Sequence, residues 1–438
     1  MMFYKETNFK ETPIGKIPKD WEIEKLGILC KFKRGFSYRS SQVTSNTTQI
    51  RFLTINDVEK EGGLKREAEK LYIKEGVEVD PEFFVNEGDV FIANTDMAKG
   101  FIIGAPLLMK NMNGKYVYSM DLTKLIFNKA KVNSIFLFYY LTHPSMRIRM
   151  KASAQGTNVL HLNHIIVSNF FIPLPSLPEQ QRIAEILSTF DEAIQKTNEI
   201  IAKTECLKKG LMQELLTKGI GHKEFKDTEI GRIPKEWEVV KLKDVVSEAK
   251  PGFACGKRDE NGILQLRMDN IEPEGWINVE AGVKVPIPED VEDYILKPGD
   301  ILFNNTNSVD LIGKTAIFRG EFSRCVYSNH LTRIRVDRSK VVPEWVLYLL
   351  IRKWELGVFK VICHRHVHQA GINNEDLLRL KIPLPSLQEQ QKITSIILTV
   401  DSKIKLERME KAKLEKIKQG LMDLLLTGKI RVKVNSNG

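Results

Sequence analysis

The feature that most constrains this chain is that two stretches of its sequence occur twice. Ile172–Gln181 (IPLPSLPEQQ) returns as Ile382–Gln391 (IPLPSLQEQQ), 210 positions further along. Gly210–Thr217 (GLMQELLT) returns at the same offset as Gly420–Thr427 (GLMDLLLT). This period is too long for a solenoid, whose repeats span about 20–50 residues. The sequence therefore predicts two copies of one large module.

Between these blocks the two halves agree only in outline. Phe9–Glu22 matches Phe225–Glu238, and Glu87–Thr95 is echoed by Pro298–Thr306. The Gly-Asp pairs of the latter two segments predict a turn followed by a short apolar strand. Nearly identical connectors beside divergent domains indicate that the connectors share one task while the domains perform two different ones.

Each Ile-Pro-Leu-Pro block is followed by a segment that predicts a long helix of about 40 residues, or about 60 Å. Its apolar residues recur at steps of three and four, which is typical of a helix packed on another helix. Polar residues, including Thr197 and Lys411, interrupt the stripe. The simplest way to bury it is for the two helices to pack on each other; a core helix, or a target for a partner's helix, is the alternative. The predicted seam comprises Ile183, Leu187, Phe190, Ile194, Ile201, Leu207, Leu211 and Leu215, and then Ile393, Ile397, Val400, Ile404, Leu414, Ile417, Leu421 and Leu425.

Charge and cysteine content narrow the class of protein. The 438 residues carry a formal net charge of +10, with a pI near 9.1, which favours an anionic partner such as nucleic acid. The five cysteines are scattered and form no C-x-x-C pair, which argues against a disulfide framework or a zinc ribbon and for a reducing compartment. No apolar stretch approaches the length of a membrane span. We expect a cytoplasmic protein with no membrane partner.

The doubled motifs resemble those of a known family. Ile-Pro-Leu-Pro-Ser-Leu-x-Glu-Gln-Gln, a long helix and Gly-Leu-Met-x-x-Leu-Leu-Thr look like the conserved regions of the specificity subunits of type I restriction–modification systems. Ile-Gly-x-Ile-Pro-x-x-Trp, at Ile14–Trp21 and Ile230–Trp237, is similar to the start of each of their target-recognition domains. The resemblance covers the whole chain in the family's order.

The resemblance implies a fold and a domain order. We expect two pseudo-repeated target-recognition domains of mixed α/β (α+β) class, separated by two long helices that form an antiparallel coiled coil. The N-terminal recognition domain would span residues 1–176 and the central helix residues 177–219. The C-terminal recognition domain would span residues 220–386, the second helix residues 387–427, and a tail residues 428–438.

The resemblance also implies partners and a division of labour. Each recognition domain would read one half of a bipartite site in double-stranded DNA, and the helices would set the spacer and dock two modification subunits that methylate adenine. S-adenosylmethionine would be bound by those subunits, and ATP and Mg²⁺ would be used by restriction subunits. This chain would hold no cofactor and no metal and would not be an enzyme.

A search for catalytic residues agrees with a non-catalytic role. Gly313-Lys314-Thr315 ends like a phosphate-binding loop, but Ser308 occupies the place of the required first glycine. The segment from Cys363 to His368 (CHRHVH) could hold a metal, contact DNA or form a solvated loop. The first half has no such ligands at the matching place. Two other functions stay open: a fused restriction or methylation enzyme, and a structural coiled-coil adaptor with two protein-binding heads.

Candidate DNA contacts are basic, amide and hydroxyl residues near aromatic ones. Arginine and lysine suit phosphates and guanine, and asparagine and glutamine suit adenine. In the first half they are Lys31, Lys33, Arg34, Tyr38, Arg39, Asn94, Thr95, Arg147, Arg149, Lys151 and Gln155. In the second half they are Lys257, Arg258, Asn304, Asn305, His364, Arg365, His366 and Gln369.

Overall fold

The computed structural model describes residues 3–65, 69–97, 100–365, 367 and 369–433. The chain divides into two compact units, each of which combines residues from distant parts of the sequence. The first unit is formed by Met1–Thr197 together with Glu410–Gly438, and the second by Asn198–Met409. Each unit therefore contains one head and one half of each long helix.

The head of the first unit is built on two four-stranded sheets. All neighbouring strands in them are antiparallel except β12 and β7, which run parallel. Helices α2 (Ser134–Thr142) and α3 (Pro144–Ala152) follow the sheets in the chain. The inner sheet has the order β11 (Pro106–Leu108), β9 (Val90–Ala93), β13 (Leu122–Phe127) and β5 (Cys30–Arg34); the outer sheet has the order β12 (Lys115–Tyr118), β7 (Ile50–Leu53), β8 (Leu71–Ile73) and β6 (Val43–Thr44).

The head of the second unit repeats this plan. Its outer sheet again contains one parallel pair, β21 with β26. Helices α6 (Pro343–Glu355) and α7 (Val358–Ile362) take the places of α2 and α3 in the chain order. The inner sheet has the order β20 (Val246–Pro251), β27 (Leu331–Val336), β23 (Ile301–Asn304) and β25 (Thr315–Ile317); the outer sheet has the order β22 (Val283–Val285), β21 (Ile263–Leu266) and β26 (Cys325–Tyr327).

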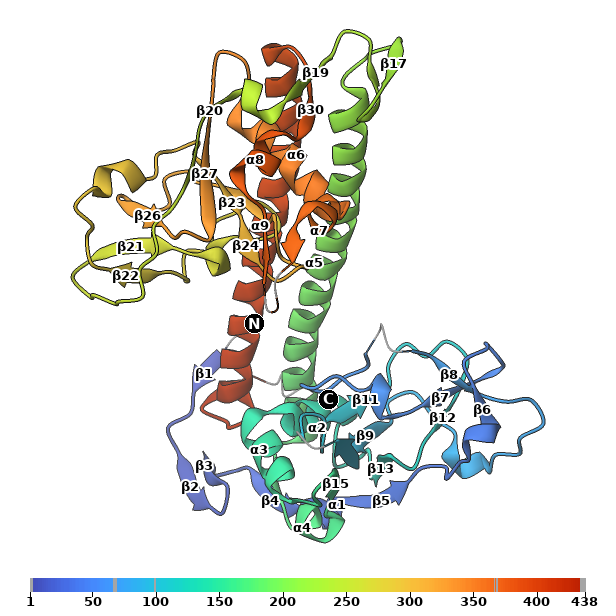
Figure 1. The fold of residues 1–438 in the computed structure, drawn as a ribbon. Helices are drawn as coiled ribbons and strands as arrows, with labels where there is room; N and C mark the ends of the chain where they lie inside the picture. The colour runs from blue at the N-terminus through green and yellow to red at the C-terminus, as the bar shows by residue number, and fades with distance from the viewer. Residues whose placement is uncertain (1–2, 66–68, 98–99, 366, 368, 434–438) are drawn as a thin grey trace. The chain divides into compact units, whose positions relative to one another are not determined.

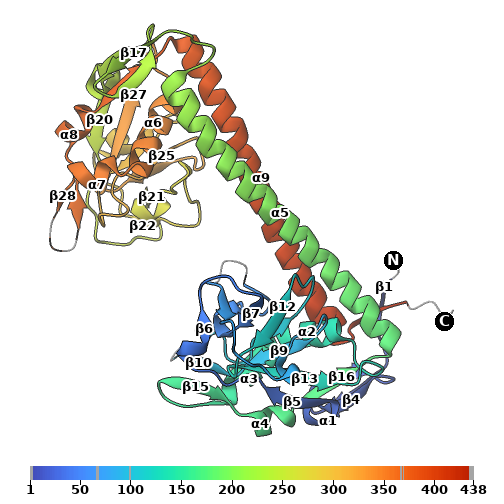
Figure 2. The ribbon, with the colours of Figure 1, turned by 90° about the vertical axis from the view of Figure 1, so that its right-hand side faces the viewer.

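The two long helices are α5 (Leu177–Lys218) and α9 (Leu387–Leu425), and they pack side by side in opposite directions (Figures 1 and 2). In the first unit, Ile183 and Leu187 of α5 share a core with Met422 and Leu425 of α9. In the second unit, the core includes Met212 and Leu216 of α5 with Ile393 and Ile397 of α9. The predicted fold class, a pair of repeated α/β heads on an antiparallel helix pair, is confirmed.

Most of the predicted seam is buried or half-buried, but two positions were placed wrongly. Leu207 is 56% exposed and Ile417 is 40% exposed. On α5 the buried stripe runs instead through Thr197, Thr204 and Lys208, which are 7%, 8% and 9% exposed. The two threonine hydroxyls donate to the backbone carbonyls four residues earlier, so their burial leaves no unsatisfied donor. A pattern based on apolar residues alone assigns the wrong position where the buried stripe consists of polar residues. The remaining seam residues are buried (Ile183, Leu187, Ile393, Ile397, Ile404, Leu425) or half-buried (Phe190, Ile194, Ile201, Leu211, Leu215, Val400, Leu414, Leu421).

Matching ion pairs join the helices in both units. Asp191 accepts hydrogen bonds from Lys418 Nζ at 2.5 Å and from the Tyr139 hydroxyl at 2.6 Å. At the 210-residue offset, Asp401 pairs with Lys208 at 2.6 Å and accepts from the Tyr348 hydroxyl at 2.9 Å. Because each tyrosine comes from a head, each aspartate ties a head to both helices. The Asp401–Lys208 pair is largely buried, and a buried polar pair can select one helix register over its alternatives.

The first glutamine of each Glu-Gln-Gln motif, Gln180 or Gln390, anchors the start of a head helix. Gln180 accepts from the backbone N–H of Asn133 at 2.9 Å and donates to the carbonyls of Lys131 and Pro175, both at 3.0 Å. Gln390 makes the same three bonds, to Val342, Lys340 and Pro385. Asn133 and Val342 are the N-cap residues that directly precede α2 and α6. The glutamine therefore fixes the head helix to the first turn of the long helix.

The glutamate of the motif binds the tryptophan that begins each head, but its second partner differs. Glu179 accepts from Trp21 Nε1 at 3.2 Å and Glu389 from Trp237 Nε1 at 3.0 Å. Glu389 also contacts His222 Nε2 at 2.8 Å. Glu179 instead pairs with Arg431, near the C-terminus of the chain, at 2.5 and 2.7 Å.

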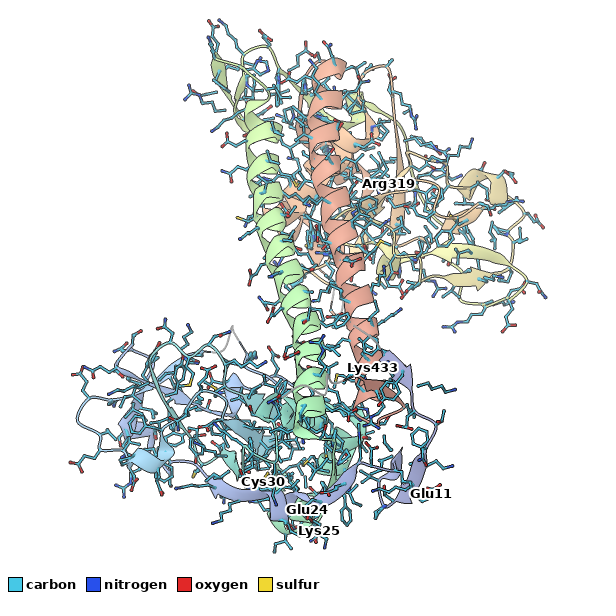
Figure 3. The ribbon with its side chains drawn as sticks, turned by 180° about the vertical axis from the view of Figure 1, so that it is seen from behind. Glu11, Glu24, Lys25, Cys30, Arg319 and Lys433 are labelled. Carbon is cyan, nitrogen blue, oxygen red and sulfur yellow. The ribbon has the colours of Figure 1, made fainter. Side chains whose placement is uncertain are left out.

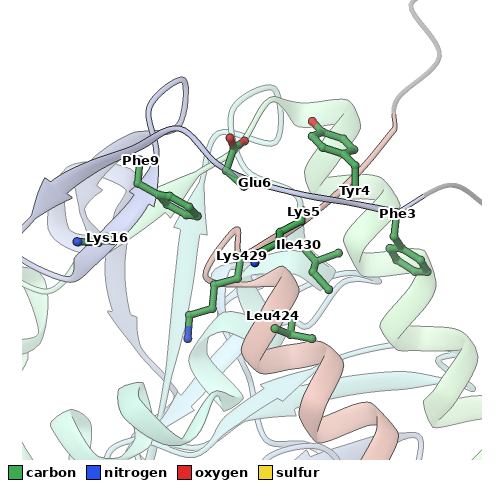
Figure 4. Close-up of a pocket in the computed structure, with 9 residues that line it drawn as sticks. All are labelled: Phe3, Tyr4, Lys5, Glu6, Phe9, Lys16, Leu424, Lys429 and Ile430. Carbon is green, nitrogen blue, oxygen red and sulfur yellow. The ribbon is translucent and has the colours of Figure 1, made fainter.

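Arg431 belongs to a junction of the two ends of the described chain. Strand β1 (Phe3–Lys5) pairs antiparallel with β31 (Ile430–Val432). A concavity of about 590 Å³ lies beside this pair, with Phe3, Phe9, Leu424 and Ile430 among its lining residues (Figure 4). Strand β31 thus supplies a partner for the motif glutamate of the first unit, Arg431. The segment after α5 supplies the corresponding partner in the second unit, His222.

The second unit has a further contact between head and helix, with no counterpart among the described residues of the first. The Trp276 ring lies between Arg319, at 4.0 Å and labelled in Figure 3, and Lys405 of α9, at 4.3 Å. Nearby, Arg408 of α9 binds Glu274 of the head at 3.0 Å and Glu205 of α5 at 2.7 Å. These contacts join the loop before β22 to both helices.

Candidate nucleic-acid interface

Each head carries a small three-stranded sheet that follows its central strand. In the first head the order is β10 (Thr95–Met97), β15 (Val159–Leu162) and β14 (Ala154–Gln155). In the second head the order is β24 (Thr306–Asn307), β29 (Ala370–Gly371) and β28 (His364–Arg365). All neighbouring strands in both sheets are antiparallel. We call them the distal sheets.

The distal sheets bring together candidate residues that are far apart in the sequence. Thr95 pairs with His161, which in turn pairs with Gln155, so the strand between them places Thr95 and Gln155 in one sheet. In the second head, Arg365 pairs with Ala370, and Gln369 directly precedes that strand. Gln155, Arg365 and Gln369 are exposed. Their amide and guanidinium groups can donate to or accept from base edges or phosphates.

Only part of the predicted cluster from Cys363 to His368 lies within the described residues. The His364 ring nitrogen Nε2 lies 2.8 Å from a carboxylate oxygen of Asp376. His366 lies outside the described residues, as does His368. Within the part of the chain that the structure describes, no three histidine, cysteine or acidic side chains are grouped as metal ligands.

The three asparagines proposed as DNA contacts are buried, which corrects the sequence prediction. Asn94, Asn304 and Asn305 are 2%, 0% and 8% exposed. The Asn94 side chain accepts from the Thr123 hydroxyl at 2.7 Å and donates to the Met120 carbonyl at 3.2 Å. Asn94 and Asn305 directly follow the central strands and hold the neighbouring turns, whereas the Asn304 amide is enclosed without a hydrogen-bond partner among the described residues. None of the three side chains is exposed to a ligand.

In the second head the same network recurs around Asn305. Its amide donates to the Asn329 carbonyl at 3.1 Å and to the Thr332 hydroxyl at 3.0 Å. Asn305 and Thr332 therefore correspond to Asn94 and Thr123 in position and as bonded partners, although the threonine hydroxyl donates in the first head and accepts in the second. Two copies of one network indicate a scaffold role.

In the first basic run, strand β5 holds Lys31, Lys33 and Arg34, whereas Tyr38 and Arg39 follow it in the chain. Lys31, Arg34 and Arg39 are exposed. Lys33 instead forms an ion pair with Glu82, and the Tyr38 ring packs edge-on against the buried Phe52 at 4.7 Å.

Arg34 lies toward the base of the distal sheet. The pKa of the His164 imidazole is lowered by burial and by the positive charge of Arg34. His164 Nε2 lies 2.8 Å from the Asn94 side-chain oxygen, at the end of the central strand. Arg34 is also the strand partner of Thr123, whose hydroxyl binds Asn94.

The second basic run lies on helix α3 and is mostly structural. Arg147 donates to the carbonyls of Ile103, Phe101 and Lys60 at 2.8, 3.2 and 3.3 Å, and burial lowers its pKa to about 10. It remains a cation at neutral pH, but its donors hold the surrounding loops.

Its neighbours on α3 contact aromatic rings. The Arg149 guanidinium lies 4.4 Å from the Phe170 ring, and Lys151 Nζ lies 5.4 Å from the Phe101 ring. Lys151 is exposed, whereas Arg149 is half-buried. In the second head, Lys257 and Arg258 are exposed in the loop between β20 and β21.

One shared element was missed in the sequence. Gly35-Phe36 and Gly252-Phe253 follow β5 and β20 at corresponding places. A Cβ on Gly35 would lie 2.3 Å from the Ser119 carbonyl oxygen, and one on Gly252 would lie 2.2 Å from the Tyr327 carbonyl oxygen. The close backbone approach requires glycine at both places. The signal was a Gly-Phe pair present in each half.

A scan of the described helices for membrane spans finds none that is both long and apolar enough.

Comparisons with known proteins agree on one family. The family model for the type I restriction modification DNA specificity domain matches residues 18–205 and again residues 234–416. The type I restriction enzyme MjaVIII specificity subunit of Methanocaldococcus jannaschii is 32% identical over 448 aligned residues, covering 99% of this chain and 98% of that protein. The EcoBI specificity subunit of Escherichia coli is 23% identical, covering 86% of this chain and 78% of that protein.

Solved structures share the fold at low sequence identity. The crystal structure of a type I restriction–modification S subunit from M. genitalium matches with a TM-score of 0.60 and 14% identity, over 95% of this chain and 97% of that one. A second structure, described as the basis of complex assembly and conformational transition of a type I system, matches with a TM-score of 0.52 and 19% identity, over 94% and 99%.

Proposed function

Because the chain belongs to the family of type I restriction–modification DNA specificity subunits, we propose that it reads a bipartite site in double-stranded DNA, one half with each head. The observation that carries the proposal is the pair of distal sheets. They occupy the same place in two heads of the same plan, yet they expose different side chains, such as Gln155 in one and Arg365 and Gln369 in the other. Two readers on one scaffold suit a site with two different halves.

The helix pair would have two tasks. It would set the spacer between the half-sites, because both heads are anchored to it through the Glu-Gln motifs and the tyrosine–aspartate bonds. It would also dock two modification subunits, which bind S-adenosylmethionine and methylate an adenine in each half. Restriction subunits would add ATP- and Mg²⁺-dependent translocation and cleavage, and the whole complex would work in the cytoplasm. This chain itself would catalyse no reaction.

The test is to co-express the chain with its modification subunits and map methylated adenines across the genome. We expect one bipartite motif with a fixed gap. Replacing residues 1–176 with the head of another system should change one half of that motif only. A change in both halves, or methylation without a defined motif, would contradict the proposal.

A single residue can be tested in the same assay. Gln155→Ala should relax or abolish recognition of one base pair in the first head's half-site, since a bidentate amide–adenine contact is worth about 1–3 kcal/mol. Asn158→Ala, in the adjoining exposed turn, is a control that distinguishes the strand from the loop. If Gln155→Ala leaves both half-sites and their methylation rates unchanged, this glutamine is not a base contact.

The competing function, a protein-binding adaptor, makes a different prediction. An adaptor would show no salt-dependent affinity for DNA in the assembled complex, whereas a reader's affinity falls steeply with salt concentration.

A further inference from the structure

The outer sheet of the first head carries a basic concavity. It has a volume of about 590 Å³ and lies over strands β7, β8 and β12, which are labelled together in Figure 1. Its polar lining includes Arg51, Lys65, Lys70 and Lys115, with the rings of Tyr72 and Tyr116. We call it the outer pocket.

The strand register places its central residues in one row. Arg51 on β7 is paired with Tyr116 on β12 and with Tyr72 on β8. Residues paired across neighbouring strands lie on the same face of a sheet. The Arg51 guanidinium carbon lies 5.7 Å from the centre of the Tyr72 ring. An arginine is thus held between two tyrosines on the face that lines the pocket.

The charge of the pocket is strongly one-sided. Among the described residues that line it, four are cations and none is acidic. Lys70 and Lys115 are exposed. The nearest compensating group is the buried Asp57, which pairs with Arg51 through Nη2. The pocket therefore presents a net positive charge to solvent.

One donor in the row has no acceptor. Arg51 Nη1 is buried and makes no hydrogen bond within the described residues, while Nη2 is taken by Asp57. An unpaired buried N–H is costly, because it has lost its hydrogen bond to water. The side chain of Arg51 is 13% exposed, so its position is set by the fold rather than by solvent. Nη1 itself is enclosed, so a ligand with an anionic oxygen would meet the accessible part of Arg51 that lines the pocket.

The scaffold does not require this arrangement. At the matching place in the second head, Leu264 on β21 is paired with Cys325 on β26 and with Lys284 on β22. The row Tyr116–Arg51–Tyr72 is replaced there by cysteine, leucine and lysine. Since the fold forms without the basic row, the row is a property of the first head alone.

We propose that the outer pocket binds a phosphate group, and that this phosphate belongs to the DNA backbone beside the half-site read by the first head. The proposal rests on the proposed function, because only a DNA-reading head would meet that backbone. The arginine and the lysines supply positive charge to a phosphate, and tyrosine and threonine hydroxyls add neutral donors. A free phosphate or a phosphorylated small molecule offers the same chemistry.

The first experiment measures the salt dependence of DNA binding by the complex with modification subunits. Lys70→Ala/Lys115→Ala removes two exposed charges of the pocket. Lys19→Ala/Lys129→Ala removes two exposed charges of the same unit outside it and is the matched control. Each lost phosphate contact reduces the slope of log affinity against log salt by about 0.9. We expect a slope that is shallower by about 1–2 for the pocket variant and nearly unchanged for the control.

The second experiment locates the phosphate by ethylation interference, in which single backbone phosphates are neutralised. For the wild-type complex, one or two phosphates flanking the first half-site should interfere with binding when ethylated. For Lys70→Ala/Lys115→Ala, the same ethylations should no longer weaken binding, while the methylated sequence stays the same. Equal interference patterns in both proteins would overturn the assignment.

A third arm separates the two sources of phosphate. Wild type and pocket variant are melted with and without inorganic phosphate at constant ionic strength. If phosphate stabilises only the wild type and the DNA results do not differ, the pocket serves a small anion and the DNA assignment is wrong. If the pocket variant behaves like the wild type in both DNA experiments while the wild-type complex methylates a specific sequence, this inference alone is refuted. Loss of sequence-specific methylation in the wild type refutes the proposed function.

Discussion

Replacing Arg431 with methionine tests how the C-terminal strand completes the first unit. Arg431 is 8% exposed in its side chain and binds Glu179, which is 2% exposed, through two hydrogen bonds. It also binds Glu6 at 2.8 Å and Asp20 at 2.9 Å. The substitution keeps an unbranched apolar stem but removes the guanidinium, which leaves the Glu179 carboxylate with Trp21 Nε1 as its remaining donor among the described residues.

The expected cost follows from the burial of the pair. Removing one partner of a buried ion pair costs about 3–5 kcal/mol, because the other charge stays desolvated. A unit of this size loses about 2–4 °C in Tm per kcal/mol. Arg431→Met should therefore lower the Tm of the first unit by about 6–20 °C. Lys235→Met, which removes a pair with Glu224 that is 68% and 73% exposed, should cost at most about 1 kcal/mol.

The pH dependence gives an independent check. The hydrogen bond from Arg431 lowers the pKa of Asp20, and backbone hydrogen bonds together with Arg431 lower the pKa of Glu6. A carboxylate whose pKa is lowered by folding adds stability above its unfolded pKa and loses it as the pH falls through the folded value. The Tm gap between wild type and Arg431→Met should be full at pH 7 and shrink below about pH 4. Calorimetric melting of both proteins between pH 7 and pH 3 measures this, and a gap under 1 °C at pH 7 would refute the reasoning.

Three further predictions concern the helix pair. Lys208→Met should destabilise the second unit by about 3–5 kcal/mol, and adding Asp401→Leu should restore most of the loss, as denaturant melts will show. Leu207→Ala should cost less than about 0.5 kcal/mol, because the residue is exposed, whereas a buried leucine costs about 2–5 kcal/mol. Deleting the matched heptads Thr197–Lys203 and Glu407–Lys413 shortens the pair by about 10 Å, and methylome mapping should then show a spacer shorter by about one to three base pairs or no methylation. An unaltered spacer in a folded deletion variant would show that the helices do not set it.

The long helices were the most predictable part of the structure, because their signals are local. The Pro-Leu-Pro blocks precede both of them, and the observed helices begin at Leu177 and Leu387. Gly219 and Gly428, with φ of +67° and +71°, lie just beyond their ends, as expected for the left-handed residue that terminates a helix. The repeat of 210 residues also indicated that the two halves share one scaffold.

The candidate site was harder to predict, because residue type does not show what a side chain contacts. Asn94 and Gln155 are both amides that follow or belong to short strands, yet one is buried in a network and the other is exposed. The outer pocket depends on cross-strand register: Arg51, Tyr72 and Tyr116 are spread over 66 positions of sequence and share no motif. Such a row becomes visible only when the pairing of strands is known.

The repeated and unrepeated contacts together suggest how such a chain can change what it reads. In each unit the head is held by the same bonds, from the motif glutamine to the start of a head helix, from the motif glutamate to a tryptophan, and from a helix aspartate to a tyrosine. None of these bonds involves a distal sheet, so the exposed side chains there can vary without loosening the helix pair. The unshared contacts, Arg431 in the first unit and Trp276 in the second, lie on the scaffold side of the heads. A head transplanted with its own tryptophan and tyrosine would therefore dock on the existing helices, provided that the transplant also keeps the partner that its motif glutamate needs.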